Sequence, residues 1–353
     1  MSEAASEAPS AASAPKTNRL GLTKDQYGGA PSTMCKGCGH DRISEAVIQA
    51  AFEVGLDAKS LIKMSGIGCS SKTPAYFIGR ALGLNSTHGR MPSFATGAHV
   101  ANRSMTALGV SGDGDTASIG MGQFVHLVRR NARMVYIVEN NGVYGLTKGQ
   151  FSATADRASP SKRGAHPTEE AIDLCGLALE LGCGFVARSF SGDKKQLVPL
   201  LEAALSFDGL AFIDVISPCV TFNNHDASTK SYTYIKEHDV HFHDPAYVAS
   251  FEHIDVEYEP GAAIDVKLHD GSRLVLRKLE KEYDPTSRAE AARVLGETRS
   301  RGEVLTGMIH IATDKPTLIS GAKLSKTPLA MLGEKELRPS KQALAKLMGS
   351  YRF

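Results

Sequence analysis

The sequence predicts an α/β fold, a doubly wound parallel sheet with a C-terminal extension, from three observations. Short apolar runs suited to buried strands alternate with amphipathic, helix-like segments between residues 41 and 216, and parallel strands joined by right-handed crossovers produce this alternation. Polar, glycine-containing turns follow several of these runs, at the strand ends where open α/β sheets bind ligands. A chain of 353 residues with 42% hydrophobic content can form one such domain and an extension.

The expected elements follow from periodicity and flanking turns. Runs such as LIKM, ALGVSG, MVYIVE and AFIDVIS are short and apolar, which favours strands, whereas EEAIDLCGLALELG has a helical pattern. In chain order we expect helix 41–55, strand 60–66, helices 73–83 and 96–106, strand 107–113, helix 118–131, strand 134–139, helix 169–182, strand 184–188, helix 193–206 and strand 210–216. Farther along, AAIDVKLHDGSRLVLRK predicts a hairpin at Asp270-Gly271. A helix near 287–294 follows, without further βαβ alternation.

Three parts of the chain are expected to differ in role. Residues 1–20 are expected to form a disordered tail, because this stretch is rich in Ala, Ser and Pro and lacks the apolar core of a signal peptide. Residues 21–226 form the expected α/β domain, in which the polar segment 151–168 is a candidate lid or subunit contact. Residues 227–353 form the extension, which is expected to cover the active site or contact a partner.

Composition argues against several classes of function. The 40 basic and 38 acidic residues nearly cancel, so we expect no binding to nucleic acid or to an anionic membrane. No run of 18 apolar residues is present, which argues against a transmembrane helix. Six cysteines without a secretion signal indicate a reducing compartment, and we expect a cytoplasmic protein.

A candidate metal site lies in two motifs that follow neighbouring strands, GDG at 112–114 and NN at 140–141. Because the carboxyl ends of the two strands meet at one edge of the sheet, the side chains of Asp113 and Asn141 place two hard oxygen ligands together. The backbone carbonyl of Val143 can supply a third. Ligands of this type suit Mg²⁺ bound beside a phosphate.

The same motifs indicate a bound diphosphate. Gly114 allows a diphosphate to approach the backbone, and helix 118–131 would face it with its N-terminus. GDG followed by NN resembles the thiamine diphosphate signature, whereas the spacing does not suit a dinucleotide-binding GxGxxG. The alternative is a strand-turn-helix without a ligand, with Asn-Asn-Gly as an ordinary turn.

Four cysteines lie in loops where a ligand can project: Cys35, Cys38, Cys69 and Cys219. Cys175 and Cys183 lie in or next to a helical segment, so we assign them to packing. Four loop thiolates can bind zinc or an iron–sulfur cluster. Zinc ribbons usually pair two CxxC knuckles, but this chain has only one, and ligation of a cluster tolerates the scatter of the other two better.

Taken together, five ordered motifs resemble the β subunit of the 2-oxoacid:ferredoxin oxidoreductases, most closely the 2-oxoglutarate:ferredoxin oxidoreductase (2-oxoglutarate synthase) type. They are CxxCGH at 35–40, GIGCS at 66–70, HGR with ATG at 88–97, GDGD at 112–115 and ENNGVYGLTKGQ at 139–150. The resemblance covers roughly residues 21–226. It implies the diphosphate-binding half of a thiamine diphosphate site and, in many members, one [4Fe–4S] cluster.

The resemblance also implies roles for individual residues. Cys35, Cys38, Cys69 and Cys219 match the cluster ligands, with Cys183 as the alternative to Cys219. Asp113, Asn141 and the Val143 carbonyl match the Mg²⁺ ligands. The segments that contact thiamine diphosphate match Ile67, Gly68, Cys69, Ser70, His88, Gly114, Asp115, Gly145 and Leu146.

A second domain and several partners are implied as well. The family's α subunit carries the pyrimidine-half domain and the catalytic carboxylate, so this chain is expected to be inactive alone and to assemble as αβ or (αβ)₂. The implied reaction is oxidative decarboxylation of a 2-oxoacid with coenzyme A, and ferredoxin accepts the electrons through the cluster.

Two lysines bear on the substrate. Lys148 follows the metal loop and Lys72 follows Cys69, and the distal carboxylate of a dicarboxylic 2-oxoacid needs a cation where water is excluded. Pyruvate-specific relatives look smaller at the position of Lys148. We therefore expect 2-oxoglutarate as substrate, with succinyl-CoA and CO₂ as products. The alternatives are a subunit for pyruvate or a broad 2-oxoacid range, and a non-catalytic thiamine diphosphate-binding chain with a structural zinc.

Overall fold

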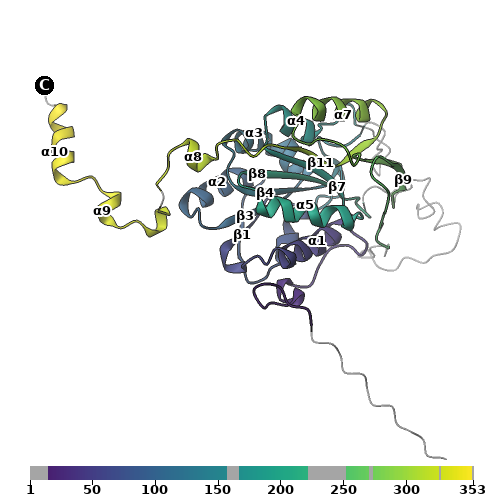
Figure 1. Cartoon of the computed structure of the whole chain (residues 1–353), viewed down its shortest axis with the longest axis horizontal. Coiled ribbons are helices and arrows are strands. Elements are labelled where there is room, and N and C mark those ends of the chain that lie inside the picture. Colours follow the sequence, from purple (N-terminus) through teal and green to yellow (C-terminus); the bar gives the residue numbers. More distant parts are fainter. Residues whose placement is uncertain (1–14, 157–166, 222–251, 270–272, 326, 352–353) are drawn as a thin grey trace, which may run out of the picture.

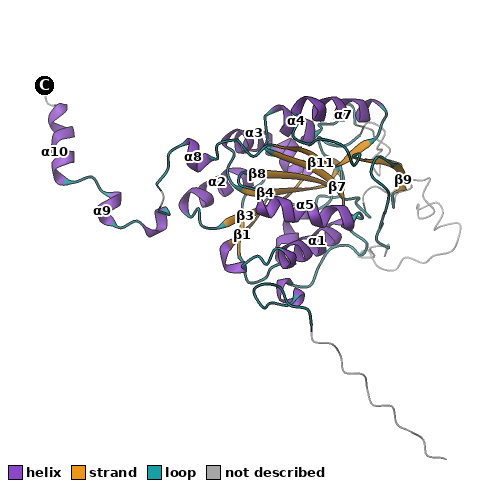
Figure 2. Cartoon of the chain, in the orientation of Figure 1, coloured by secondary structure: helices purple, strands orange, loops and turns teal. Residues whose placement is uncertain are grey.

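The computed structural model describes residues 15–156, 167–221, 252–269, 273–325 and 327–351. Within these residues nine strands form one sheet, with helices on both faces (Figures 1 and 2). The strand order is β2-β1-β3-β4-β8-β7-β11-β10-β9. The expected α/β class and mostly parallel sheet are confirmed.

The first half of the domain contains α1 (Gly39–Glu53), β1 (Leu61–Ser65), β2 (Leu82–Asn85), α2 (Met91–Ala101), β3 (Thr106–Gly112), α3 (Met121–Arg130) and β4 (Met134–Asn140). A short hairpin of β5 (Val143–Tyr144) and β6 (Gln150–Phe151) follows, then α4 (Leu174–Glu180), β7 (Phe185–Phe190), α5 (Lys194–Ser206) and β8 (Leu210–Ile216). Strands β1 to β4, β7 and β8 are parallel. Their carboxyl ends therefore lie along one edge of the sheet.

Four expected helices are corrected by the structure. The helix expected at 96–106 lies five residues earlier, at Met91–Ala101, and the helix expected at 169–182 is shorter, at Leu174–Glu180. The segment 73–83 is not a helix: Pro74 lies in a 3-10 helix that ends at Ala75, Ile78 is left-handed with φ 42, and β2 follows. The helix expected at 118–131 begins at Met121, after a π-helical turn at Gly114–Ile119. Residues of that turn, rather than the N-terminus of α3, therefore lie next to the GDG motif.

The C-terminal part adds three strands to the sheet: β9 (Ala263–Lys267), β10 (Arg273–Lys278) and β11 (Val304–Ile311), with α7 (Arg288–Ser300) between the last two. Strands β10 and β11 are parallel, so they form a βαβ unit with α7 that the sequence analysis missed. Strand β11 pairs antiparallel with β7, and the expected hairpin of β9 and β10 is present. The boundary expected at residues 226 and 227 and the Asp270-Gly271 turn lie outside the described residues.

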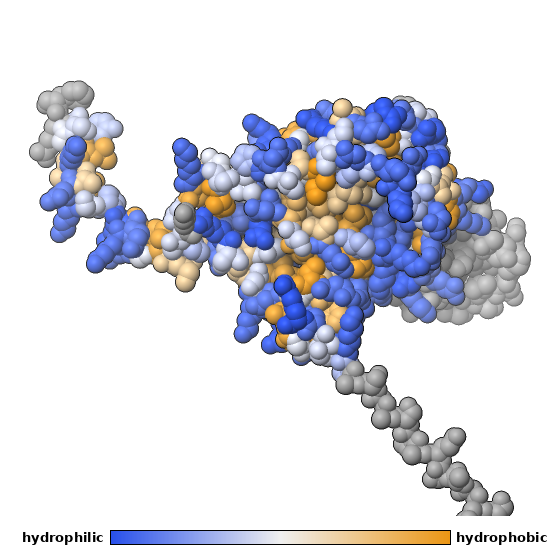
Figure 3. Space-filling model, in the orientation of Figure 1, coloured by the Kyte–Doolittle hydropathy of each residue, from blue (hydrophilic) through white to orange (hydrophobic). Residues whose placement is uncertain are grey.

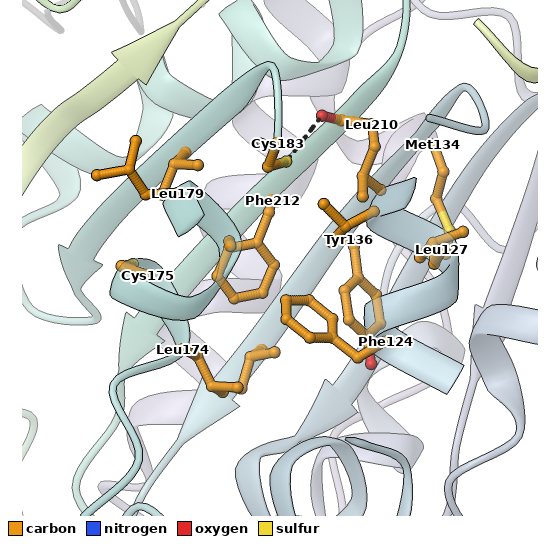
Figure 4. Close-up of a cluster of buried hydrophobic side chains, with 14 of the residues drawn as sticks. Phe124, Leu127, Met134, Tyr136, Leu174, Cys175, Leu179, Cys183, Leu210 and Phe212 are labelled. Carbon is orange, nitrogen blue, oxygen red and sulfur yellow. Dashed lines mark hydrogen bonds between the residues drawn. The ribbon is translucent and has the colours of Figure 1, made fainter. Parts of the chain in front are cut away.

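The hydrophobic core has two layers, one on each face of the sheet. Helices α1 and α5 cover one face, and α2, α3, α4 and α7 cover the other. In the second layer the rings of Phe124 and Phe212 lie 5.0 Å apart, with Tyr136 beside them (Figure 4). Cys175 and Cys183 are buried in this layer, as expected for packing residues.

The two ends of the described chain differ. Residues 1–14 of the expected tail lie outside the description, but Asn18 donates hydrogen bonds to the Tyr27 hydroxyl and the Phe52 carbonyl, which attaches this segment to the body. At the other end α8 (Leu318–Gly321) still packs against the core through Leu318, and beyond it an arm with α9 (Glu334–Leu337) and α10 (Lys341–Ser350) extends away from the sheet (Figure 1). It bears exposed apolar side chains (Figure 3). Among the described residues, no helix is long and apolar enough to cross a membrane.

Candidate active site

A cavity of about 230 Å³ opens at the carboxyl ends of β1, β3 and β4. It brings together every residue that the sequence analysis assigned to thiamine diphosphate or Mg²⁺: Ile67, Gly68, Cys69, Ser70, His88, Asp113, Gly114, Asp115, Asn141, Val143, Gly145 and Leu146. These residues come from four loops that are distant in the sequence. Their convergence follows from the parallel topology, because each loop leaves the same edge of the sheet.

The Asp113 carboxylate lines this cavity. It is buried, and one oxygen accepts a hydrogen bond from the Asn141 backbone N–H at 3.2 Å. The other oxygen accepts from the hydroxyls of Thr154, at 2.6 Å, and Ser152. Burial raises the pKa of Asp113, and these hydrogen bonds oppose the increase. The side-chain oxygen of Asn141 accepts from the Val143 N–H at 3.1 Å, so the three expected ligand residues are neighbours.

The donor set matches the chemistry of Mg²⁺, because it consists of one carboxylate and neutral oxygens beside a cavity that can admit phosphate oxygens. Taken alone, however, the described residues contain no group of three or more His, Cys, Asp or Glu side chains arranged to hold a metal ion. A magnesium site made of one Asp, one Asn, a backbone carbonyl and phosphate oxygens contains only one side chain of these four types, so it would not form such a group. The oxygen donors present at the cavity therefore suit the ion.

Asp115 connects the loops of the cavity. Its carboxylate accepts hydrogen bonds from the backbone N–H of Gly89 at 2.7 Å and of Ile67 at 3.4 Å, and from the Ser111 hydroxyl at 2.9 Å. The Asp115 side chain thus fixes the position of the 66–70 loop relative to the loop before α2. A Cβ added at Gly66 would lie 1.8 Å from this carboxylate, so that position requires glycine.

Gly114 and Tyr144 form a close contact at the opposite wall. The Tyr144 hydroxyl donates to the Gly114 carbonyl at 3.1 Å. A Cβ on Gly114 would lie 2.5 Å from the Tyr144 ring. Absence of a side chain at Gly114 therefore allows the ring to close this wall and leaves the backbone open to a ligand.

His40 and Glu139 form the back of the cavity, and the sequence analysis did not assign either to it. Both are buried; His40 Nδ1 lies 2.6 Å from the Ser217 hydroxyl oxygen and 3.6 Å from Glu139 Oε2. Burial lowers the pKa of His40 to about 4 and raises the pKa of Glu139 well above its usual value. His40 is therefore neutral near pH 7, and burial favours the neutral form of Glu139.

The four loop cysteines form two pairs that are close enough for one thiolate to affect the pKa of the other, Cys38 with Cys219 and Cys69 with Cys35. They do not form a single metal-binding group, because among the described residues no three His, Cys, Asp or Glu side chains are arranged to hold a metal ion. Cys38 is the residue before α1, Cys69 lines the cavity, and Cys219 follows β8. Burial raises the pKa of Cys38, and the proximity of Cys219 adds to this effect. Burial also raises the pKa of Cys69, with Lys72 opposing the increase and Cys35 adding to it. Thr221 places its hydroxyl 3.4 Å from the sulfur of Cys35.

The two lysines assigned to the substrate do not line the cavity. Both are exposed. Lys148 is in a left-handed conformation with φ 79, at the turn between β5 and β6. Lys72 lies near the Cys69 thiol instead.

Ser152 and Thr154 also belong to this site, although the sequence of 151–168 predicts only a polar loop. Residues 157–166 of that loop lie outside the described residues. The backbone N–H of Ala153 donates to the Ser118 hydroxyl at 3.1 Å, which attaches the start of the loop to the π-helical turn. No local pattern signals this contact, because it joins residues far apart in the sequence.

Comparisons with known proteins agree with this geometry. The family described as "Thiamine pyrophosphate enzyme, C-terminal TPP binding domain" matches residues 66–215. A 2-oxoacid:ferredoxin oxidoreductase subunit beta from a Sulfolobus species is 43% identical over 199 residues, which are 56% of this chain and 65% of that protein. The 2-oxoglutarate synthase subunit KorB of Methanocaldococcus jannaschii is 34% identical over 216 residues, 60% of this chain and 79% of the relative.

A solved structure extends the match to most of the chain. It is the 2-oxoglutarate:ferredoxin oxidoreductase from Magnetococcus marinus with 2-oxoglutarate, coenzyme A and succinyl-CoA bound. The TM-score is 0.70 at 25% identity, over 96% of this chain and 100% of that one. This chain spans 65% of the length of the Sulfolobus relative. On these matches, the chain belongs to the family of 2-oxoacid:ferredoxin oxidoreductase β subunits.

Proposed function

We propose that this chain is the β subunit of a 2-oxoglutarate:ferredoxin oxidoreductase, which decarboxylates 2-oxoglutarate oxidatively with coenzyme A to succinyl-CoA and CO₂. The observation that carries the proposal is the single cavity lined by all the residues assigned to thiamine diphosphate and Mg²⁺. The identities of the relatives support the reaction class. The reducing cytoplasm is the compartment that suits its thiols.

In this proposal the chain positions the cofactor. Asp113, Asn141 and the Val143 carbonyl would hold Mg²⁺, and the open backbone at Gly114 would receive the diphosphate; all three residues line the cavity with Gly114. Asp115 holds the 66–70 loop against the cofactor through the N–H of Ile67. Thiamine diphosphate supplies an electron sink for the carboxylate-bearing carbon of a 2-oxoacid. The buried back wall of His40 and Glu139 keeps that end of the cavity closed to water.

The four loop cysteines would hold a [4Fe–4S] cluster. Cys38 and Cys219 lie within electrostatic range of each other, as do Cys69 and Cys35. Thiolate ligands must lose their protons, and burial alone raises the pKa of Cys38 and Cys69. Positive metal charge would reverse that effect. Ferredoxin is the acceptor implied by the names of the relatives.

An α subunit would complete the site as αβ or (αβ)₂. The C-terminal βαβ unit is too small to be a second thiamine-binding domain, and none of its described residues lines the cavity. The C-terminal arm is therefore better suited to contact a partner than to cover the cavity. The exposed side chains of Leu344, Leu347 and Met348 on α10, and of its C-cap Tyr351, recur at helical spacing and form one apolar face.

The substrate is inferred from the relatives and from one cation. The Magnetococcus enzyme was solved with 2-oxoglutarate, and the M. jannaschii relative is named a 2-oxoglutarate synthase subunit. Lys148 lies on the hairpin next to Leu146 and Thr147, which line the cavity. Closure of the α subunit over this hairpin would leave Lys148 to pair with the distal carboxylate.

The test is anaerobic co-purification with the α subunit, followed by coenzyme A-dependent viologen reduction with 2-oxoglutarate and pyruvate in parallel. We expect 2-oxoglutarate to be preferred and Lys148→Gly to remove the preference. Glycine accepts the left-handed backbone at this position. Lys323→Gly is the matched control, since Lys323 is also exposed and left-handed, with φ 50, but lies in the C-terminal arm.

The two alternatives give different results. Equal or better use of pyruvate would indicate the broad-range subunit and would contradict the role of Lys148. A colourless complex that contains zinc, binds thiamine diphosphate and reduces no viologen would indicate the non-catalytic chain. A brown chromophore that dithionite bleaches would indicate the cluster.

A further inference from the structure

A line of polar contacts leads away from Asp113 to residues that do not line the cavity. The Thr154 hydroxyl lies 2.6 Å from Asp113 Oδ2 and 3.1 Å from Asn140 Oδ1. Asn140 in turn donates its side-chain N–H to Asp214 at 3.1 Å. These contacts connect the expected metal ligand to a residue in the interior of the sheet.

The line ends at a buried ion pair. Arg188 donates from Nε to the second oxygen of Asp214 at 2.9 Å, and its other end is bonded to Asp173. Asp173 also caps α4 by accepting from the N–H of Cys175 at 3.0 Å and of Gly176 at 3.2 Å. Arg188 and Asp214 are buried. A charge that is buried and paired from both sides has little freedom to move, because breaking either contact leaves an uncompensated charge.

The sheet fixes the spacing of this network. Arg188 and Asp214 are direct partners across β7 and β8, and Asn140 lies at the end of the adjacent strand β4. Each follows a core residue two positions earlier on the same face: Val186, Phe212 and Val138. The network is thus an extension of the rigid core toward the carboxyl edge of the sheet.

The number of hydroxyl protons shows why Thr154 is the critical link. Its hydroxyl has one proton but contacts two acceptors, Asp113 Oδ2 and Asn140 Oδ1. The Ser152 hydroxyl also donates to Asp113. The Thr154 proton therefore bonds one acceptor at a time: in one arrangement it bonds Asp113, and in the other it bonds Asn140 while the Ser152 hydroxyl donates to Asp113.

We propose that Thr154 is a positioning residue that sets the Asp113 carboxylate for a divalent cation, and that Asn140, Asp214 and Arg188 fix Thr154 in turn. This inference rests on the proposed function, since Asp113 is the ligand assigned there. Residues that orient a metal ligand typically change metal affinity about 10–100-fold when they are altered.

The test measures binding rather than turnover. The full complex with its α subunit is stripped of cation and cofactor, and Mn²⁺ is titrated in the presence of thiamine diphosphate while electron paramagnetic resonance reports free Mn²⁺. We expect Thr154→Val to weaken cofactor-dependent Mn²⁺ binding by about 10–100-fold, and Thr154→Ser to restore it. Thr298→Val is the matched control: Thr298 is buried and donates to the Val294 carbonyl at 2.7 Å in α7, remote from the cavity.

A second variant tests the rest of the network. Asn140→Ala should also weaken Mn²⁺ binding, and the double variant should bind no more weakly than Thr154→Val, because both changes interrupt one path. Additive losses would contradict the path. If Thr154→Val does not fold, Asn140→Ala alone still tests whether the network positions Asp113.

The outcomes separate the inference from the proposed function. If the wild-type complex shows no thiamine diphosphate-dependent Mn²⁺ binding, the proposed function is wrong and the inference with it. If the wild type binds but Thr154→Val binds equally well, only the inference is wrong. A loss that Thr154→Ser does not restore, or that Thr298→Val shares, would mean a general structural effect and would likewise overturn it.

Discussion

Lys63 is a buried cation in β1 that holds the loop behind the candidate active site. Its ammonium group donates to the carbonyls of Pro74 at 2.6 Å and Phe77 at 2.7 Å, and it lies 5.5 Å from the centre of the Phe77 ring. The side chain is 5% exposed. We expect Lys63→Met to change both the stability of the protein and its pH dependence.

The magnitude follows from the two contacts and the pKa. Burial lowers the pKa of Lys63 from its usual 10.5 to about 8, and at about 1.4 kcal/mol per pH unit the buried charge costs about 3 kcal/mol at pH 7. Methionine removes this cost but leaves two buried carbonyls without a donor, at about 1–3 kcal/mol each. At pH 7 we therefore expect Lys63→Met to lose no more than about 3 kcal/mol.

The pH dependence is the sharper test. Because the folded-state pKa lies below the unfolded one, the unfolded chain binds more protons between pH 8 and 10.5, and wild-type stability from this group rises with pH across that window. The neutral amine still has two N–H groups for the two carbonyls. Relative to Lys63→Met, the wild type should gain about 2.5 kcal/mol between pH 7 and pH 10.

Urea unfolding of the chain at pH 7 and pH 10 measures the free energy of unfolding of each variant. Cysteines and tyrosines also titrate in this range, but their contribution is the same in the wild type and in Lys63→Met, so it drops out of the difference between the two. Lys59→Met is the matched control: Lys59 is exposed, four residues before Lys63. It should follow the wild type at both pH values. If Lys63→Met changes with pH as the wild type does, the reasoning about a costly buried charge is refuted.

Three further predictions concern the cofactors and the partner. Cys38→Ser should remove iron and colour from the anaerobic complex, whereas Cys175→Ser, in the apolar core, should keep both; equal loss would contradict the cluster assignment. Gly114→Ala should weaken thiamine diphosphate binding by about 1–3 kcal/mol, because the added Cβ meets the Tyr144 ring. Gly122 has open space around it, so Gly122→Ala should leave the affinity unchanged. Titration calorimetry measures both affinities. Deletion of residues 329–353 should weaken co-purification with the α subunit but leave the melting temperature of the isolated chain unchanged; a large fall in that temperature would mean that the arm supports the fold.

The sequence was sufficient to predict the α/β class and most of the residues that line the cavity, but not His40 and Glu139. Each cavity loop carries its own local pattern, a strand followed by a glycine turn, and parallel topology then places all such turns at one edge. The GDG motif after β3 and the Asn pair after β4 are examples. Local patterns are enough in these cases because the parallel topology determines which loops lie next to one another.

Elements that depend on distant contacts were missed. Strand β11 pairs with β7, far away in the sequence, and its role is invisible without that partner. The segment 73–83 has enough apolar residues for a helix. Instead, the Lys63 ammonium group donates hydrogen bonds to the Pro74 and Phe77 carbonyls, and the chain continues as the edge strand β2. Thr154 reaches Asp113 only in the folded chain.

One short loop, Gly66–Ser70, serves both candidate cofactor sites. Cys69 lines the cavity, and it is also one of the four cysteines that we propose as cluster ligands, close enough to Cys35 for that thiol to affect its pKa. If thiamine diphosphate and a cluster bind as proposed, a single loop therefore separates them, and an electron leaving the cavity needs no further relay within this chain. This proximity depends on two anchors outside the loop: Asp115 accepts from Ile67 on one side, and Lys63 fixes the chain beyond Lys72 on the other. A substitution at either anchor should therefore weaken thiamine diphosphate binding and cluster retention together. A substitution of a single ligand should instead affect only the group that this ligand binds.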